Sequence, residues 1–325
     1  MTDIVALGAG RMGRGIAQVF AYAGHPVTIL DFKDRPAAQS TALLDAARDE
    51  IAQNLGFLEE LGVIDGGQRT TVMARIQTAT MADAATTLSK ARIIFEGVPE
   101  ILAAKADALG RVSDLAGTEA IIASTTSTIL VDDLAAFVSG PERFLNAHWL
   151  NPAYLIPLVE VSPGAETTAT VVDEVMALLK AVGKVPVRCK ASPGYIVPRI
   201  QSVAMNEAAR IVDEGVATAE DVDTAIRTGF GIRYATMGLI EFIDWGGVDI
   251  LYYASRYLKE ALGSDRFSSP ELVDRLMADG HLGLSTGKGF YDFSKTDAEA
   301  FRREKLATFV ALLRHLDLLP TPKVD

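Results

Sequence analysis

One histidine and one glutamate, His148 and Glu160, lie on two short apolar runs and could together act as a general base. The runs cover Phe144–Leu150 and Leu155–Val161, and a turn that contains Asn151 joins them. An acid between two valines is uncommon, because a buried carboxylate needs a partner. A histidine paired with such a carboxylate can accept a proton near neutral pH. The alternative is that His148 is an ordinary core histidine and Glu160 a charge on an edge strand.

The composition excludes several classes of partner. The chain has 325 residues, enough for two domains. Its net charge of −11 argues against nucleic acid and anionic membranes. The single cysteine, Cys189, excludes an intrachain disulfide and fits a reducing compartment. No basic segment precedes the first apolar run, and no uncharged run reaches the roughly 18 residues of a membrane span. We therefore expect a soluble cytoplasmic protein, and the sequence indicates no metal site.

A glycine-rich loop follows the first apolar strand. Ile4–Leu7 runs directly into Gly8–Gly13, a GxGxxG motif, and a helical pattern leads from there to a second strand, Val27–Leu30, which ends at Asp31. The glycines permit a tight turn, let the backbone approach a pyrophosphate, and let the helix pack on the strand. The helix N-terminus can bind the phosphates. The combination predicts a Rossmann-type dinucleotide site.

The acid after the second strand favours NAD as the dinucleotide. Asp31 can accept hydrogen bonds from both hydroxyls of the adenosine ribose and would repel a 2′-phosphate. Lys33 and Arg35 lie nearby and keep NADP open as the alternative. The residues predicted here to bind NAD are Gly8, Gly10, Arg11, Met12, Gly13 and Asp31.

Polar residues recur where predicted strands end. Glu96 closes a strand predicted over Arg92–Gly97, and Ser127 follows a strand predicted over Ala120–Ser124. In an open parallel sheet, ligands bind beyond the carboxyl ends of the strands. These residues and His148 would therefore share one edge, which favours a catalytic role for His148. The alternative for Ser127 is that it caps a helix.

The chain changes character near Lys190–Pro193. Before this point a helix-rich segment at about 36–73 is longer than one crossover needs and would form an arm of two helices. After it we find only helical patterns, among them one over Thr236–Leu262, and the apolar stretch Gly238–Ala254 suggests burial on several sides. We predict an α/β fold: a Rossmann-type doubly wound sheet in residues 1–190, followed by an all-α C-terminal domain in residues 191–325. The apolar helices of this domain would pack against a second copy.

Several motifs in a fixed order make the sequence similar to the L-3-hydroxyacyl-CoA dehydrogenase family over nearly the whole chain. The glycine loop, Asp31 and the FEGVPE segment resemble the NAD half of that family. The other matching segments are Ser124–Thr128, HWLNP at 148–152, LVEV at 158–161, SPGYIV at 192–197 and GLSTGKGFY at 283–291.

The resemblance implies hydride transfer between a secondary alcohol and NAD. In the forward reaction His148 would remove the hydroxyl proton, Glu160 would hold the imidazole and stabilise its charged form, and Ser127 would hydrogen-bond the reacting oxygen. The resemblance also implies a homodimer that forms through the helical domain, and a place in fatty acid metabolism. Further residues carried over from the family are Glu100 and Lys105, near the cofactor, and Asn151, at the substrate.

Two positions depart from the family pattern. Pro198 stands where the family has an asparagine that would donate to a substrate oxygen, and proline has no such donor. Residues 231–238 (GIRYATMG) are more similar to the branch that oxidises free hydroxy acids, the L-gulonate 3-dehydrogenases and carnitine dehydrogenases. Arg233 in this segment could bind a substrate carboxylate. The alternative is an ordinary arginine at a helix end.

Three functions remain open on the sequence. The first is NAD-dependent oxidation of a short-chain 3-hydroxyacyl-CoA such as 3-hydroxybutyryl-CoA. The second keeps this chemistry but takes a small free hydroxy acid or a hydroxylated quaternary amine. The third is a non-catalytic NAD-binding structural protein. Because Ser127, His148 and Glu160 are all present, we favour an enzyme.

Overall fold

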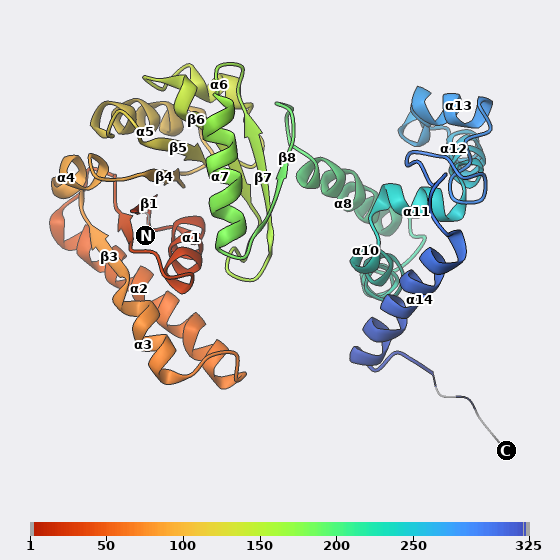
Figure 1. Cartoon of the computed structure of the whole chain (residues 1–325), viewed down its shortest axis with the longest axis horizontal. Helices are drawn as coiled ribbons and strands as arrows, with labels where there is room; N and C mark the ends of the chain where they lie inside the picture. The colour runs from red at the N-terminus through yellow and green to blue at the C-terminus, as the bar shows by residue number, and fades with distance from the viewer. Residues whose placement is uncertain (1–2, 321, 323–325) are drawn as a thin grey trace. The chain divides into compact units, whose positions relative to one another are not determined.

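The computed structural model describes residues 3–320 and 322. Contacts within the chain divide it into two compact units, Met1–Met205 and Asn206–Asp325. Most of the strands and helices of both units are labelled in Figure 1.

An eight-stranded sheet in the order β3-β2-β1-β4-β5-β6-β7-β8 forms the centre of the first unit. The first six strands are parallel, whereas β7 runs antiparallel to β6 and β8 follows the direction of β7. The predicted doubly wound sheet is therefore confirmed, with a reversed pair at one edge. The strands are β1 (Ile4–Leu7), β2 (Val27–Leu30), β3 (Ile76–Ala79), β4 (Ile93–Glu96), β5 (Ile121–Ser124), β6 (Phe144–Trp149), β7 (Leu158–Pro163) and β8 (Val185–Arg188).

Helices cover both faces of this sheet. Successive side chains of β1 indicate this, since they belong to two different hydrophobic clusters. Ile4 and Ala6 belong to one hydrophobic cluster, and Val5 and Leu7 to another. Such alternation is expected for a strand buried on both faces. The first cluster includes side chains of α1 (Arg11–Tyr22), α2 (Ala37–Glu60) and α7 (Ala169–Ala181). The second includes side chains of α4 (Ala84–Leu88), α5 (Leu102–Leu115) and α6 (Val131–Ala135).

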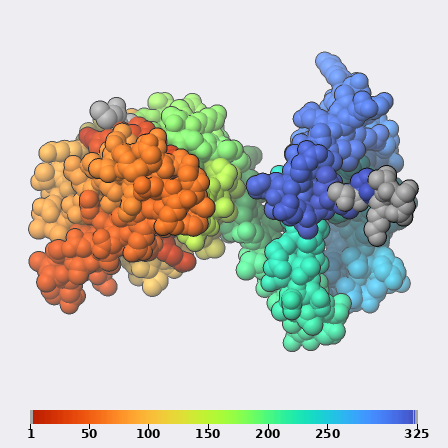
Figure 2. Space-filling model, turned by 90° about the horizontal axis from the view of Figure 1, so that it is seen from below, coloured from red at the N-terminus to blue at the C-terminus, as the bar shows by residue number. Residues whose placement is uncertain are grey.

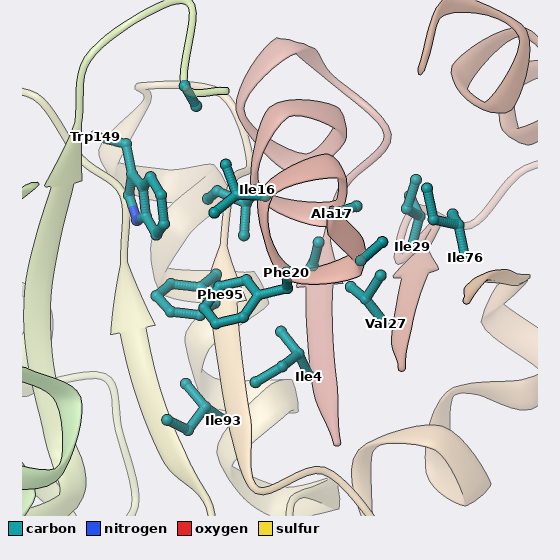
Figure 3. Close-up of a cluster of buried hydrophobic side chains, with 14 of the residues drawn as sticks. Ile4, Ile16, Ala17, Phe20, Val27, Ile29, Ile76, Ile93, Phe95 and Trp149 are labelled. Carbon is teal, nitrogen blue, oxygen red and sulfur yellow. The ribbon is translucent and has the colours of Figure 1, made fainter. Parts of the chain in front are cut away.

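Aromatic packing ties α1 to the strands that carry the site. Figure 3 shows Phe20 of α1 beside Phe95 of β4, with Trp149 of β6 on the same side of the sheet. The ring centroids of Phe20 and Phe95 are 5.3 Å apart, and those of Phe95 and Trp149 are 5.7 Å apart. Edge-on and tilted aromatic pairs of this kind add to the stability that burial gives. The last residues of β6 are thus held rigidly.

A two-helix hairpin follows β2. Its members are α2 and α3 (Gly66–Ala74), and Asp65 begins α3 by accepting a hydrogen bond of 2.8 Å from the Gln68 backbone N–H. The Gln68 side chain accepts from the Asp65 N–H in return, which makes a capping box. One face of α2 is buried on the first unit through Leu44, Ile51 and Leu55. In Figure 2 this segment, coloured orange, lies at the surface of the first unit.

The second unit is helical. The helix α8 (Val197–Asp213) begins in the first unit and ends in the second. The remaining helices are α9 (Ala219–Ala225), the π-helical turn Ile226–Gly231, α10 (Ile232–Thr236), α11 (Leu239–Gly246), α12 (Val248–Ala261), α13 (Glu271–Ala278) and α14 (Ala298–His315). No helix among the described residues is long and apolar enough to cross a membrane.

The prediction of one helix over Thr236–Leu262 is wrong, because the backbone leaves helical geometry twice. Met237 is extended, with φ −149°, so α10 ends there. Gly247 adopts φ +118°, which breaks the chain between α11 and α12. A residue with a side chain would be strained at this angle, so the glycine permits the break.

The GLSTGKGFY segment surrounds a buried acid of the second unit. Asp244, 1% exposed, accepts hydrogen bonds from the backbone N–H groups of Phe290 (3.0 Å) and Tyr291 (2.8 Å). A Cβ on Gly289 would lie 2.2 Å from the Asp244 Oδ1, and one on Gly283 would lie 2.3 Å from its carbonyl oxygen. The glycines of this motif are therefore explained by close packing on Asp244.

Candidate active site

The β6–β7 pair brings His148 and Glu160 together. The antiparallel register places the two residues opposite each other, so their side chains share one face of the sheet. The His148 Nδ1 lies 2.8 Å from the Glu160 Oε2. The histidine is 5% exposed and the glutamate 0%. The partner that the sequence suggested for each of these residues is therefore present.

The other carboxylate oxygen of Glu160 receives two backbone donors. The N–H groups of Ile196 and Val197, at the start of α8, both donate to Oε1 at 2.9 Å. Burial by itself would raise the pKa of Glu160, but the hydrogen bonds from His148 and the two N–H groups outweigh it and hold that pKa below its ordinary value. Glu160 is therefore an anion at neutral pH, and the proton on Nδ1 of His148 points toward it.

Tyr195 forms the second contact surface of the histidine. Its ring stacks on His148 with centroids 5.2 Å apart and planes 11° apart. The phenol donates to the Thr126 carbonyl at 3.0 Å and accepts from the Asn146 amide at 2.9 Å. Burial raises the pKa of Tyr195 well above its ordinary range, so the phenol stays neutral. Tyr195 therefore orients the imidazole rather than exchanging protons with it.

No role for Tyr195 follows from the sequence, although its segment carries part of the family resemblance. Tyr195 has φ +47°, in the left-handed region that aromatic residues rarely adopt. Gly194 before it also has a positive φ, of +74°. The chain thus turns sharply and directs the next two N–H groups toward Glu160. The Pro193-Gly194 pair indicates a turn, but nothing in the sequence indicates that Tyr195 would adopt a left-handed backbone and stack on His148.

Glu100 holds the loop that carries Ser127. Its Oε1 accepts from the backbone N–H groups of Ser127 (2.9 Å) and Thr128 (3.2 Å) and from the Thr126 hydroxyl at 2.5 Å. Burial would raise the pKa of Glu100, but these hydrogen bonds and the charge of Lys105 lower it overall. The helix that follows begins only at Val131, so Ser127 does not cap it. Glu100 shapes the backbone of the loop that presents the Ser127 hydroxyl.

A buried ion pair between Lys105 and Glu96 lies next to Glu100. The Lys105 Nζ lies 2.9 and 3.0 Å from the two carboxylate oxygens of Glu96, and both side chains are at most 1% exposed. The Ser124 hydroxyl also donates to Glu96, at 2.5 Å. The same ammonium lies 3.5 Å from Glu100. Lys105 thus links Glu96, at the end of β4, to Glu100, which lies just before α5, and a direct contact with NAD stays a prediction.

Removing the ammonium should destabilise the fold. The Lys105→Met variant would leave the Glu96 carboxylate buried without its cation, and breaking one partner out of a buried pair costs about 3–5 kcal/mol. Urea unfolding at pH 7 measures this loss. The same substitution at exposed Lys180 is the control and should change stability by less than about 0.5 kcal/mol. A loss below about 1 kcal/mol for Lys105→Met would contradict this account of the pair.

His148 opens onto a pocket of about 410 Å³ in the first unit. Four other residues that the sequence assigned to the site line it as well: Arg11, Met12, Ser127 and Asn151. The remaining lining residues are Trp149, Leu150, Pro198 and Gln201, of which the sequence analysis had not considered Gln201. Arg233 belongs to the second unit, where its guanidinium stacks on Phe242 at 4.4 Å. Its role as a carboxylate clamp stays a prediction.

A larger groove of about 780 Å³ runs past the glycine loop to Asp31. The loop fits a dinucleotide: a Cβ on Gly13 would lie 1.9 Å from the Gly8 carbonyl oxygen, whereas a Cβ on Gly10 would meet no atom within 4 Å. Gly10 thus leaves the room that a pyrophosphate requires. No side chain caps the N-terminus of α1, so its N–H groups are available to phosphate oxygens.

Asp31 lies at the far end of this groove and already has two partners. Its Oδ2 accepts from the Ser40 hydroxyl at 2.6 Å and pairs with the Arg35 guanidinium at 3.0 Å. These contacts fix the carboxylate so that its other oxygen can meet a ribose hydroxyl. They also explain why a basic residue next to Asp31 is compatible with an NAD site.

Comparisons with known proteins agree with this geometry. The family model described as the NAD-binding domain of 3-hydroxyacyl-CoA dehydrogenase matches residues 3–192, and the one for the C-terminal domain matches residues 194–293. The chain is 30% identical to 5-formyl-3-hydroxy-2-methylpyridine 4-carboxylate 5-dehydrogenase of Mesorhizobium japonicum, over 97% of this chain and 98% of that one. It is 31% identical to human mitochondrial hydroxyacyl-coenzyme A dehydrogenase, over 89% and 90% of the two chains.

Solved structures show the same relationship. The crystal structure of a 3-hydroxyacyl-CoA dehydrogenase from Archaeoglobus fulgidus matches with a TM-score of 0.78 and 31% identity, over 98% of this chain and 100% of that one. The structure of an NAD-dependent 5-formyl-3-hydroxy-2-methylpyridine 4-carboxylic acid 5-dehydrogenase matches with a TM-score of 0.71 and 29% identity, over 98% and 99%. The chain therefore belongs to the 3-hydroxyacyl-CoA dehydrogenase family of NAD-dependent oxidoreductases that act on CH–OH groups.

Proposed function

We propose that this protein oxidises a secondary alcohol with His148 as the general base. Because the Nδ1 proton of His148 is committed to the Glu160 anion, the lone pair of Nε2 is available to take the hydroxyl proton. Bound NAD would accept the hydride that leaves the same carbon. The Ser127 hydroxyl would donate to the substrate oxygen, and Glu160 would stabilise the imidazolium that forms. In the reverse direction the same imidazolium returns the proton.

One observation carries this proposal: His148 lines a pocket, and three neighbouring groups fix its position. Glu160 binds its Nδ1, Tyr195 stacks on its ring, and β6 fixes its backbone. A structural protein would not need a pocket-lining histidine fixed in one tautomer. The test is the loss of substrate-dependent NADH oxidation when His148 is replaced.

Two classes of substrate agree with the family. Many relatives, including those named 3-hydroxybutyryl-CoA dehydrogenase, support a short-chain 3-hydroxyacyl-CoA and with it a place in fatty acid metabolism. A free hydroxy acid is the second candidate, and one observation favours it: the relative named as a pyridine carboxylate dehydrogenase matches this chain almost end to end. Acetoacetyl-CoA and acetoacetate are therefore the first two compounds to test with NADH.

We also propose that the protein is a cytoplasmic homodimer that forms through its helical half. Ile250, Tyr253 and Tyr257 of α12 are 61%, 60% and 71% exposed. Large apolar side chains in such numbers are typical of a surface that a partner covers. Sedimentation equilibrium should give a dimer for the wild type, and Tyr257→Asp should shift it toward monomer. Tyr291→Asp, at a residue that is 52% exposed on a loop, is the control. A wild-type monomer at micromolar concentration would contradict the proposal.

A further inference from the structure

The pocket in front of His148 is lined by donors and by no acid. Its polar lining side chains are the guanidinium of Arg11, the amides of Asn151 and Gln201, and the Ser127 hydroxyl, beside His148 itself. Within residues 3–320 and 322, none of the first four side chains has a hydrogen-bond or ion-pair partner. A pocket with a free cation and free donors suits an anionic ligand.

Arg11 lines the pocket in front of His148 and is not among the residues that line the dinucleotide groove. It is the first residue of α1, directly after Gly10 of the loop. The groove that leads to Asp31 is lined by Gly8, Gly10 and Arg14, but not by Arg11. The N-terminus of α1 adds positive potential at the same point. The charge of Arg11 is thus placed beside His148, where a substrate would lie.

Gln201 supplies the amide that Pro198 cannot. The two residues are three positions apart on α8, so they lie on the same face of the helix, and both line the pocket. A side-chain amide at the position of Pro198 would donate to substrate oxygen in the family pattern. Gln201 provides the same group one turn later on a longer side chain.

We propose that the substrate is a small free hydroxy acid whose carboxylate pairs with Arg11, and that Gln201 donates to the same ligand. This inference rests on the proposed dehydrogenase function and names its substrate class. A guanidinium can bind both oxygens of a carboxylate. A thioester has no carboxylate and so cannot form this pair. The volume of about 410 Å³ is within the range of small-molecule sites. Arg11 therefore determines specificity for the free acid over its neutral or thioester derivatives.

Binding to the enzyme loaded with NAD⁺ tests this proposal without turnover, because the oxidised cofactor has no hydride to give to a ketone. Acetoacetate and acetoacetamide differ in charge but hardly in size, and calorimetry measures their dissociation constants. We expect the wild type to bind acetoacetate about 10–100-fold more tightly, because only the acid offers a charged acceptor to the guanidinium. Arg11→Gln should abolish this preference, and Arg11→Lys should keep part of it. The matched control is Arg210→Gln on the exposed part of α8, which should keep the preference.

Three results would overturn the proposal. The first is equal affinity of the wild type for the acid and the amide, or a clear preference for acetoacetyl-CoA over both. The second is that Arg11→Gln weakens NADH binding and leaves the preference intact, which would assign Arg11 to the cofactor phosphates. The third is that Arg233→Ala removes the preference and Arg11→Gln does not. Failure of the dehydrogenase function itself would look different: carboxylate binding would persist without any NADH oxidation by the wild type.

Discussion

Replacing His148 with alanine is expected to lower kcat/KM by about 10²–10⁴-fold, the usual contribution of a positioned general base. The alcohol proton must leave as hydride departs, because otherwise positive charge accumulates on the carbonyl oxygen that forms. No other pocket-lining side chain offers a basic lone pair for this proton: a guanidinium has no acceptor, and hydroxyl and amide groups are not bases at neutral pH. Steady-state assays of NADH oxidation, with acetoacetyl-CoA and acetoacetate as substrates, measure the loss.

The same variant should bind NADH as the wild type does. His148 is not among the residues that line the dinucleotide groove, so the dissociation constant of NADH, measured by fluorescence, should stay within about twofold. His315→Ala, at an exposed residue of α14, is the control for replacing a histidine. Activity of His148→Ala within about tenfold of the wild type would remove His148 from the mechanism. A loss of NADH binding would instead indicate a structural role.

The sheet could be predicted from the sequence because its signals are local. The strands β1 and β2 begin and end at the predicted residues, and each is an apolar run bounded by glycine, proline or an acid. The pairing of His148 with Glu160 needed only one further assumption, that the two runs form a hairpin. The register of β6 and β7 satisfies it.

The contacts that hold the site residues in place could not be predicted, because they join residues that are far apart in the sequence. Glu100 was expected near the cofactor, yet its hydrogen bonds go to the Ser127 loop, 26 to 28 residues away. Tyr195 reaches His148 through a left-handed backbone turn that its residue type disfavours. Gly247 breaks a helix that periodicity alone predicts to continue. In each case a tertiary contact or a rare backbone angle prevails over local preference.

Two halves of the site are thus held by different means. An ion-pair network through Glu96, Lys105 and Glu100 fixes the loop that would hold the substrate oxygen. A sheet pair and the start of α8 fix the base through Glu160. Because α8 also carries Pro198 and Gln201, the residue that orients the base is bonded to the helix that lines the substrate pocket. Substrate contacts on α8 can therefore affect the base through Glu160.

The Glu160→Gln variant tests this arrangement without changing the size of the side chain. Its amide oxygen could still accept from Ile196 and Val197, which leaves the amide NH₂ facing His148. Two donors cannot share one hydrogen bond, so the imidazole would carry its proton on Nε2 and present no lone pair to the substrate. By analogy with triads in which the orienting acid becomes an amide, kcat should fall by about 10²–10⁴-fold.

Stability at low pH gives a second, independent readout of the same variant. The pKa of Glu160 in the folded protein is lowered from 4.5, so its contribution to stability is fully present above about pH 4.5 and is lost as the pH falls through the folded value. Urea midpoints between pH 7 and pH 3 should therefore decline less steeply for Glu160→Gln than for the wild type. Glu174→Gln, which removes a half-exposed partner of Arg92 on α7, is the control and should leave kcat unchanged. If Glu160→Gln keeps wild-type kcat, the carboxylate does not set the tautomer of His148, and the base must be oriented by Tyr195 alone.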